Sequence, residues 1–279
     1  YVKLEQYNLT GSIKDRIALY IIEEEKKLGN LKEKMPIIEA TSGNTGISFS
    51  SIGAKLGHPV YIFMPNWVSK ERKELMKLYG TKIYLISKED GGFNRCIEEA
   101  DKLAVKIKGY RPNQFSNPLN TKCHYLTTGT EIVNQIPEEI GGFISGIGSG
   151  GTLMGISKKI KEIYPNSLIG VVEPDKMPLL TARKIIGEHK IEGIGDEFIP
   201  DLVDTTIIDK VFDINDDDAI NMARLINKKL GLGVGISSGA NLLGAILLSE
   251  YTNKKVVTIF PDDNKKYLTT ELSNNINLK

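Results

Sequence analysis

Short, largely apolar runs alternate along the chain with segments in which apolar residues recur every three or four positions. Apolar runs bounded by turn residues are typical of parallel strands buried on both faces, whereas the longer period predicts amphipathic helices. The pattern therefore predicts an α/β fold. Strands are expected at 36–40, 60–64, 82–86, 142–147, 168–173, 206–211 and 256–260. Helices are expected at 14–28, 46–56, 70–78, 93–108, 121–135, 152–163, 216–230 and 239–251.

Helix start signals and a break in composition add detail to this pattern. Ser69 precedes the segment 70–78 and Asn215 precedes 216–230, so both residues are expected to act as N-caps. The Pro- and Asn-rich stretch 111–118 predicts a crossing between lobes. Because 279 residues are enough to build two lobes that share a cleft, a two-lobed arrangement is favoured.

Composition narrows the classes of function. The 36 Lys and Arg residues are interspersed with 35 Asp and Glu residues, so no nucleic-acid surface is expected. No apolar run is long enough to span a bilayer, and no membrane role is expected. Cys96 and Cys123 lack the CxxC spacing of a metal or redox site, which predicts free thiols, no metal site and a cytoplasmic location. The chain starts at Tyr1 within a recognisable element, so further residues are expected before it.

The first of four segments with candidate chemistry is 8–16, where Lys14 follows a glycine-containing loop at the start of a predicted helix. The positive end of the helix dipole lowers the pKa of an amine, and a neutral amine can condense with an aldehyde. The alternative is a variant of the capping box, with Ser12 as the N-cap and Asp15 at its third position. For this segment taken alone, capping is favoured.

The second segment, 41–46, consists of small and polar residues between a predicted strand and a helix. Parallel sheets place their ligand-binding loops there, and the free N–H groups of the helix start can bind a carboxylate or a phosphate. A glycine-rich turn with a Thr or Asn cap is the alternative, but the unbroken run of such residues favours binding. In the fourth segment, 235–240, either serine can serve simply as a helix cap.

The third segment, 146–152, lies between a predicted strand and a helix and fits two kinds of ligand. Its glycines match the dinucleotide-binding pattern GxGxxG, and Glu173 lies at the end of the next strand, where a ribose-binding acid is expected. An NAD-dependent dehydrogenase is therefore an alternative function. Four glycines with Ser149 and Thr152 equally suit a single phosphate group at a helix N-terminus. The glycines that match GxGxxG are Gly146, Gly148 and Gly151.

In this order the four segments resemble the cysteine synthase family, the fold-type-II pyridoxal phosphate (PLP) enzymes that include O-acetylserine sulfhydrylase and cystathionine β-synthase. The resemblance covers nearly the whole chain, with matching motifs at 3–5, 11–16, 41–46, 64–65, 69–73, 114–118, 148–152, 193–195, 235–239 and 267–270. It implies a two-lobed fold like that of the tryptophan synthase β-subunit, with mostly parallel sheets covered by helices and the active site between the lobes. The smaller, mobile lobe is expected at 8–117, carrying Lys14 and the 41–46 loop. The larger lobe is expected at 1–7 plus 118–279, carrying the phosphate loop and Ser237.

The resemblance also implies roles for individual residues. Lys14 would form the Schiff base with PLP and later transfer protons, Asn44 would bind the ring oxygen O3′, and Ser237 would face the pyridine nitrogen. The residues expected to bind the phosphate are Gly148, Ser149, Gly150, Gly151 and Thr152. The residues expected to bind the substrate, chiefly its α-carboxylate, are Thr41, Ser42, Asn44, Thr45, Gln114 and Gly193.

The type of reaction follows from the residue at the pyridine nitrogen. A neutral serine cannot hold a protonated ring nitrogen by charge, which favours prompt loss of a β-substituent over transamination. The sequence thus predicts β-replacement on a β-substituted L-alanine, O-acetylserine or cysteine, through an α-aminoacrylate. The base expectation is the family's commonest reaction, O-acetylserine plus sulfide giving cysteine and acetate. A homodimer is expected, and serine acetyltransferase is a candidate partner.

Asp196 is the main departure from the family pattern, because many sulfhydrylases have alanine in this glycine-rich loop. A carboxylate over the cofactor is costly unless it is solvated or paired, so Asp196 is expected either to turn outward or to be functional. If it faces the reacting carbon, it could activate water or protonate a departing thiolate. This predicts the alternative of a cysteine-consuming enzyme that produces hydrogen sulfide and adds water or a thiol.

Overall fold

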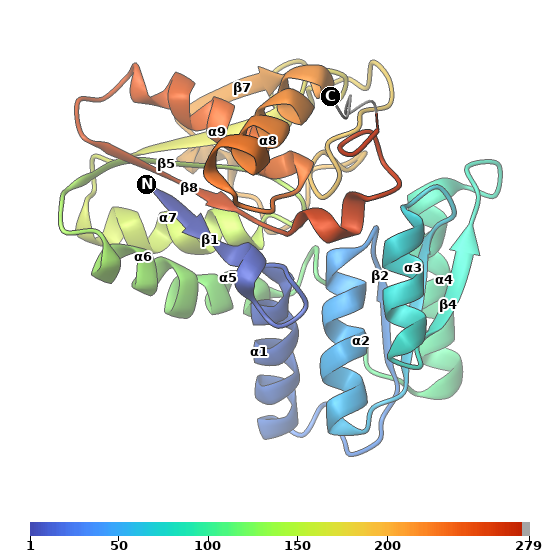
Figure 1. Ribbon diagram of the computed structural model, residues 1–279. Helices are drawn as coiled ribbons and strands as arrows, with labels where there is room; N and C mark the ends of the chain where they lie inside the picture. The colour runs from blue at the N-terminus through green and yellow to red at the C-terminus, as the bar shows by residue number, and fades with distance from the viewer. Residues whose placement is uncertain (275–279) are drawn as a thin grey trace. The chain divides into compact units, whose positions relative to one another are not determined.

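The computed structural model describes residues 1–274, and the chain forms two compact units (Figure 1). The first unit comprises Tyr1–Tyr7 and Gln114–Asn264, and the second comprises Asn8–Asn113 and the described residues from Lys265. The sequence had placed the change of lobe at 117 and had assigned the residues after 264 to the larger lobe. They belong with the second unit because Lys266 hydrogen-bonds to its first loop. The last five residues of the expected larger lobe lie outside the described residues.

A five-stranded parallel sheet forms the centre of the first unit, in the order β1-β8-β5-β6-β7. The strands are β1 (Val2–Leu4), β5 (Ile140–Gly146), β6 (Leu168–Pro174), β7 (Lys210–Ile214) and β8 (Lys255–Phe260). Most of β5 and β6 is buried, as expected for parallel strands covered on both faces. Two predictions were incomplete: β1 was missed, and β7 begins later than expected because Asp204 caps a short turn, η3 (Thr205–Ile207), by accepting the Thr206 N–H.

Helices cover both faces of this sheet (Figure 1), with α8 and α9 on one side and α5, α6 and α7 on the other. The helical elements are η1 (Glu5–Tyr7), α5 (Pro118–His124), η2 (Tyr125–Gly129), α6 (Thr130–Gln135), α7 (Gly151–Ile163), α8 (Asp216–Leu230) and α9 (Ile236–Ser249). The helix predicted at 121–135 is interrupted by η2, a π-helical turn. There the hydroxyls of Thr127 and Thr130 donate to backbone carbonyls, which compensates for the wider helical turn.

The second unit contains a three-stranded parallel sheet in the order β2-β3-β4. Its strands are β2 (Ile37–Ala40), β3 (Val60–Pro65) and β4 (Lys82–Ile86), and its helices are α1 (Lys14–Lys27), α2 (Asn44–Leu56), α3 (Lys70–Leu78) and α4 (Gly92–Ile107). Helix α4 packs on β2 and β3, as does α2, which also contacts α1 and α3. A short turn, η4 (Asn264–Tyr267), joins the two units in sequence. The predicted α/β class with parallel sheets is therefore confirmed.

The predicted N-caps had different outcomes. Asn215 caps α8 by accepting the N–H of Asp217. Ser69 precedes α3 but makes no capping bond; its hydroxyl donates to the Lys266 carbonyl and accepts from the Arg72 guanidinium. A contact with the distant C-terminal segment thus replaces the expected local one.

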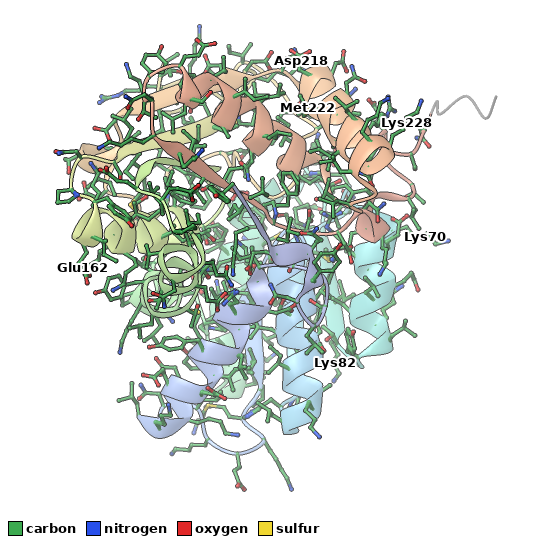
Figure 2. All side chains as sticks on the ribbon, turned by 60° about the vertical axis from the view of Figure 1, so that its left-hand side comes forward. Lys70, Lys82, Glu162, Asp218, Met222 and Lys228 are labelled. Atoms are coloured by element: carbon green, nitrogen blue, oxygen red, sulfur yellow. The ribbon has the colours of Figure 1, made fainter. Side chains whose placement is uncertain are left out.

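Charged side chains are spread over the exposed faces of both units, as their interspersed sequence pattern predicts. Figure 2 shows Lys82, Glu162 and Asp218 pointing outward from three different elements. Both cysteines are buried free thiols. Over residues 1–274, none of the helices combines the length and apolar character needed to cross a membrane.

Candidate active site

In the first unit, the loop between β5 and α7 forms a cradle of backbone N–H groups. Gly150 has a left-handed φ of 85°, which a glycine adopts at little cost, and α7 begins at Gly151. A Cβ atom at Gly148 would lie 2.4 Å from the carbonyl oxygen of Gly193, and one at Gly151 would lie 1.9 Å from Asn120 Oδ1. These positions therefore require glycine, and the loop fits an anion bound at a helix N-terminus.

Two buried hydroxyls complete this cradle. Ser149 and Thr152 are 3% and 9% exposed, and both lie within hydrogen-bond distance of side chains of α5. Asn120 Nδ2 donates to Ser149 Oγ over 2.9 Å, and Thr152 Oγ1 lies 3.2 Å from His124 Nε2. Hydroxyls beside free N–H groups at the start of a helix are a donor set suited to a phosphate, so these residues fit the phosphate of a cofactor.

Gln114 and Ser237 are also buried in the first unit. The backbone carbonyl of Gln114 accepts a hydrogen bond from Asn120 Nδ2, so one amide connects Gln114 to the phosphate loop. Ser237 lies in the first turn of α9, whose N-cap is Gly235 and has no side-chain capping bond. The expected use of these serines as helix caps is therefore not observed.

The 193–196 loop packs against the phosphate loop. The N–H of Gly195 donates to the Ile147 carbonyl over 2.9 Å. Asp196 is partly buried and lines a cavity of about 30 Å³. The walls are mostly apolar and include Val171, Met177 and Phe198. Asp196 is thus a polar group beside an apolar cavity of the first unit.

Glu173 does not have the ribose-binding role of the dehydrogenase alternative. Its carboxylate accepts hydrogen bonds from the N–H groups of Leu180 and Thr181 and from the Thr181 hydroxyl. These contacts fix the loop after β6 to the end of the strand. Because its own chain engages the carboxylate, the basis for a dinucleotide site is removed.

In the second unit, Lys14 is the first residue of α1 and therefore lies at the positive end of the helix dipole. The capping alternative holds only in part: Ser12 Oγ accepts the N–H of Lys14 over 3.3 Å, but Asp15 does not complete a capping box. The Asp15 carboxylate accepts from the N–H and hydroxyl of Thr10 and from the Ser48 hydroxyl of α2, so it joins two elements instead of capping its own helix. The loop before Lys14 is shaped by Gly11, which has a φ of 79°.

The 41–46 loop follows β2 and leads into α2, as predicted. Its Thr41 Oγ1 accepts the N–H of Gly43 over 3.0 Å, and Thr41 and Thr45 are buried. A buried cation lies against this loop, because a Cβ at Gly43 would be 2.4 Å from Arg72 Nε. The loop therefore joins a helix N-terminus to a nearby positive charge, which suits a carboxylate ligand.

The C-terminal segment connects the two loops of the second unit. Lys266 is 1% exposed, and its Nζ donates to the Gly11 carbonyl over 2.8 Å. The Lys266 carbonyl accepts from Arg72 over 3.0 Å, and the Arg72 guanidinium lies 4.5 Å from the centre of the Tyr267 ring. Sequence reasoning missed Arg72 and Lys266. A signal for Arg72 was available, since it lies four residues before the apolar Met76 on the buried face of α3.

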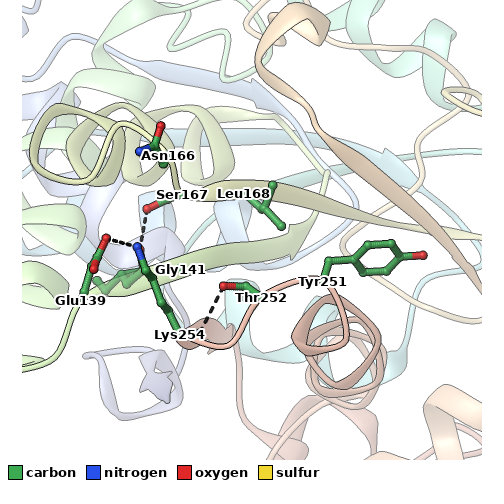
Figure 3. A pocket seen from close by; sticks show the side chains of 9 residues that line it. Glu139, Gly141, Asn166, Ser167, Leu168, Tyr251, Thr252 and Lys254 are labelled. Carbon is green, nitrogen blue, oxygen red and sulfur yellow. Dashed lines mark hydrogen bonds and ion pairs between the residues drawn. The ribbon is translucent and has the colours of Figure 1, made fainter.

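A larger cavity of the first unit, about 160 Å³, lies outside the candidate site (Figure 3). It is lined by residues at the amino ends of β5, β6 and β8, including Ile140 and Leu168, with Glu139 and Lys254 forming an ion pair at its edge. Ligands of parallel α/β sheets bind at the carboxyl ends of strands, where the phosphate loop follows β5. This cavity is at the opposite ends of the same strands.

The predicted site residues are thus divided between the units. The first unit carries Gln114, Gly148, Ser149, Gly150, Gly151, Thr152, Gly193, Asp196 and Ser237. The second carries Lys14, Thr41, Ser42, Asn44 and Thr45.

Comparison with known proteins decides the family, because the profile described as "Pyridoxal-phosphate dependent enzyme" matches residues 1–262. The chain belongs to this family. Its cofactor is pyridoxal phosphate.

Individual relatives narrow the class further. A cysteine synthase of Staphylococcus aureus is 39% identical over 275 residues, which cover 98% of this chain and 88% of the relative. The solved structure of a hydrogen sulfide-producing enzyme of Fusobacterium nucleatum superposes with a TM-score of 0.95 at 50% identity, covering 100% of this chain and 85% of that one. An aspartate-to-asparagine variant of that enzyme is known in complex with an α-aminoacrylate intermediate. The O-acetylserine-dependent cystathionine β-synthase of Helicobacter pylori has a TM-score of 0.93 at 36% identity, covering 98% and 89%.

These comparisons confirm the family resemblance drawn from the sequence. The protein is a PLP-dependent, cysteine synthase-like enzyme, and an amino acid is its substrate. The expected phosphate-loop glycines and the lysine at the start of α1 are both present in the sequence order that the resemblance requires.

Proposed function

We propose that the enzyme catalyses β-replacement on β-substituted L-alanines and that cysteine is a donor from which it releases hydrogen sulfide. The observation that carries this proposal is Asp196, a carboxyl group beside an apolar cavity in a loop that packs on the phosphate loop. The 50% identity to a hydrogen sulfide-producing enzyme supports the same reaction.

Individual residues are proposed to hold the separate groups of the cofactor. Lys14 provides the amine that holds the aldehyde, and Asn44 binds the ring oxygen O3′. Residues 148–152 bind the phosphate through backbone N–H groups and the hydroxyls of Ser149 and Thr152. The glycines of this loop support the assignment, since they let the loop pack closely against Gly193 and Asn120 while it leads into the N-terminus of α7, where an anion can bind.

When bound, PLP supplies an electron sink that makes the Cα–H bond of an amino acid acidic and assists loss of a β-substituent. Lys14 Nζ takes the Cα proton, and its place at the N-terminus of α1 favours the neutral amine that this step needs. The 41–46 loop, Gln114 and Gly193 bind the substrate, and the loop and Gln114 hold its α-carboxylate. The positive end of α2 and the buried Arg72 stabilise that charge electrostatically.

Ser237 favours one of the reactions that PLP can support over another. It lies in the first turn of α9, where the helix dipole disfavours a positive charge. A hydroxyl can donate a hydrogen bond to a neutral pyridine nitrogen, but it cannot stabilise a protonated one by charge. Both effects make the ring a weaker sink, so elimination of a β-substituent is favoured over transamination.

Asp196 acts as the acid and then as the base of the β-carbon chemistry. As the Cβ–S bond of cysteine breaks, the protonated carboxyl transfers its proton to sulfur, and hydrogen sulfide leaves. The carboxylate then takes the proton of an incoming thiol or water as the new bond to Cβ forms. The net reaction converts cysteine and a thiol into a thioether and hydrogen sulfide, or cysteine and water into serine and hydrogen sulfide.

The second candidate is formation of cysteine and acetate from O-acetylserine and sulfide. Its support is the 39% identity to a cysteine synthase. Acetate is a better leaving group than a thiolate and needs no proton from Asp196. The two candidates therefore differ in their dependence on this carboxyl group.

The test measures sulfide release from cysteine and cysteine formation from O-acetylserine plus sulfide, for wild type, Asp196→Asn and Glu197→Gln. Glu197 is the exposed neighbouring carboxylate and serves as the control. We expect Asp196→Asn to lose sulfide release by about 100-fold, in line with the loss of a general acid, while Glu197→Gln keeps it. Equal rates in wild type and Asp196→Asn would refute the role of Asp196. Loss of the visible cofactor absorbance in Lys14→Ala tests the lysine separately.

A further inference from the structure

Two side chains of α5 contact the hydroxyls of the phosphate loop. Asn120 and His124 are one helical turn apart on α5, and both are buried. Asn120 reaches Ser149, and His124 reaches Thr152. Neither α5 residue was among the functional residues predicted from the sequence.

The orientation of the Asn120 amide is fixed by its second partner. Its nitrogen lies 2.9 Å from the backbone carbonyl oxygen of Gln114, which can only accept a hydrogen bond. The same nitrogen lies 2.9 Å from Ser149 Oγ, so the second amide hydrogen is donated to that hydroxyl. Ser149 therefore accepts from α5, and its own hydrogen is left for another acceptor.

His124 also contacts a hydroxyl of the phosphate loop, through its imidazole ring. Its Nδ1 lies 2.9 Å from Thr128 Oγ1, and its Nε2 lies 3.2 Å from Thr152 Oγ1. A neutral imidazole has one donor and one acceptor nitrogen. If the Thr128 hydroxyl donates to Nδ1, then Nε2–H donates to Thr152, and the Thr152 hydrogen is left for another acceptor, as it is at Ser149.

Helix α5 packs in close contact with α7. A Cβ at Gly155 would lie 2.4 Å from the Thr121 carbonyl oxygen and 2.7 Å from His124 Cβ. A Cβ at Gly129, at the end of η2, would lie 2.8 Å from Lys159 Cβ. Glycines thus bring the two helices together closely enough for the side chains of α5 to reach the start of α7.

We propose that Asn120 and His124 are positioning residues that turn both hydroxyls of the loop, Ser149 and Thr152, into donors toward the cofactor phosphate. A hydroxyl has one hydrogen to donate, and accepting a bond from α5 directs that hydrogen to the bound anion. The inference rests on the proposed function, which assigns residues 148–152 to the phosphate. It adds that α5 sets the direction of these hydrogen bonds.

The test compares binding of PLP and of pyridoxal, which lacks the phosphate, to apoenzyme by absorbance titration. In His124→Gln the side-chain amide can replace Nε2, whereas the shorter side chain of His124→Asn reaches Thr128 but not Thr152. We expect His124→Asn to weaken PLP binding by roughly tenfold or more, as for a lost hydrogen bond to a charged group, and to leave pyridoxal binding unchanged. His124→Gln should restore most of the affinity for PLP.

A double-mutant cycle with Thr152→Val tests whether His124 acts through this hydroxyl. In the Thr152→Val background, His124→Asn should cause less than a twofold further loss of PLP affinity, because the group that it orients is gone. The ³¹P resonance of bound PLP should shift in His124→Asn and return in His124→Gln. Thermal unfolding of each apoenzyme variant reports stability independently.

The outcomes separate the inference from the function on which it rests. If His124→Asn weakens PLP and pyridoxal equally, or if its effect adds fully to that of Thr152→Val, the positioning role is wrong. If wild-type apoenzyme binds PLP no more tightly than pyridoxal, the assignment of the phosphate loop fails, and the proposed function fails with it.

Discussion

Replacing Arg72 by methionine should destabilise the second unit strongly, because Arg72 lies on the buried face of α3. Arg72 is 2% exposed, and its guanidinium donates to Ser69 Oγ over 2.9 Å and to the Lys266 carbonyl over 3.0 Å. It also lies 4.5 Å from the centre of the Tyr267 ring. Methionine fills part of the volume but makes none of these contacts, so the Lys266 carbonyl loses a donor.

The expected magnitude follows from these contacts. Each hydrogen bond from a charged donor contributes about 1.5–3 kcal/mol, and a desolvated cation–π contact about 2 kcal/mol. Removing the buried cation also removes its desolvation penalty, which offsets part of that loss. We therefore expect the free energy of unfolding to fall by about 3 kcal/mol, near the lower end of the range for breaking a buried charge network.

The assay is urea unfolding followed by the fluorescence of Trp67, the single tryptophan of the chain, which lies in the second unit. With a slope of about 2 kcal/mol per molar urea, the midpoint should fall by about 1.5 M. Arg95→Met is the matched control, because Arg95 is an arginine of the same unit whose side chain is 42% exposed in its ion pair with Glu98. If Arg72→Met and Arg95→Met shift the midpoint equally, the reasoning from buried contacts is refuted.

Three further outcomes are expected. Burial raises the pKa of the Cys96 thiol from 9.0 to about 12, so the unfolded chain ionises this thiol at a lower pH than the folded chain does. The free energy of unfolding should therefore fall as the pH rises from 9 toward 12, and Cys96→Ala should reduce this fall when unfolding is measured at several pH values. Gly155→Ala should lower the unfolding midpoint far more than Gly187→Ala, whose Cβ would meet nothing within 4 Å, and equal effects would contradict close packing of α5 on α7. Lys266→Met should weaken PLP binding to apoenzyme by disturbing the loop before Lys14, whereas the exposed Lys265→Met should bind normally.

The periodic elements could be predicted because their signals are local. The bounds of α3 (Lys70–Leu78) and β4 (Lys82–Ile86) agree with the sequence at both ends. Strand β1 was missed because three residues carry no period, and its pairing with β8 depends on a segment at the other end of the chain. The loops proposed to bind ligand could be located for a related reason, since clusters of glycine and hydroxyl residues between a strand and a helix are recognisable without any tertiary contact.

The supports of those loops were not predictable, because each joins residues that are distant in sequence. Arg72 and the Lys266 carbonyl are 194 positions apart, and Asn120 and Ser149 are 29 apart. The buried position of Arg72 could be inferred from Met76 one turn later, but its partners could not, and Lys266, Asn120 and His124 look like any other polar residues until their partners are known. In both units the ligand loop supplies small residues, and a separate element supplies the hydrogen bonds that fix it. Glycine lets a ligand approach the backbone closely, but it also leaves the backbone of the loop more conformational freedom. A glycine-rich loop therefore needs hydrogen bonds from another element to hold one conformation.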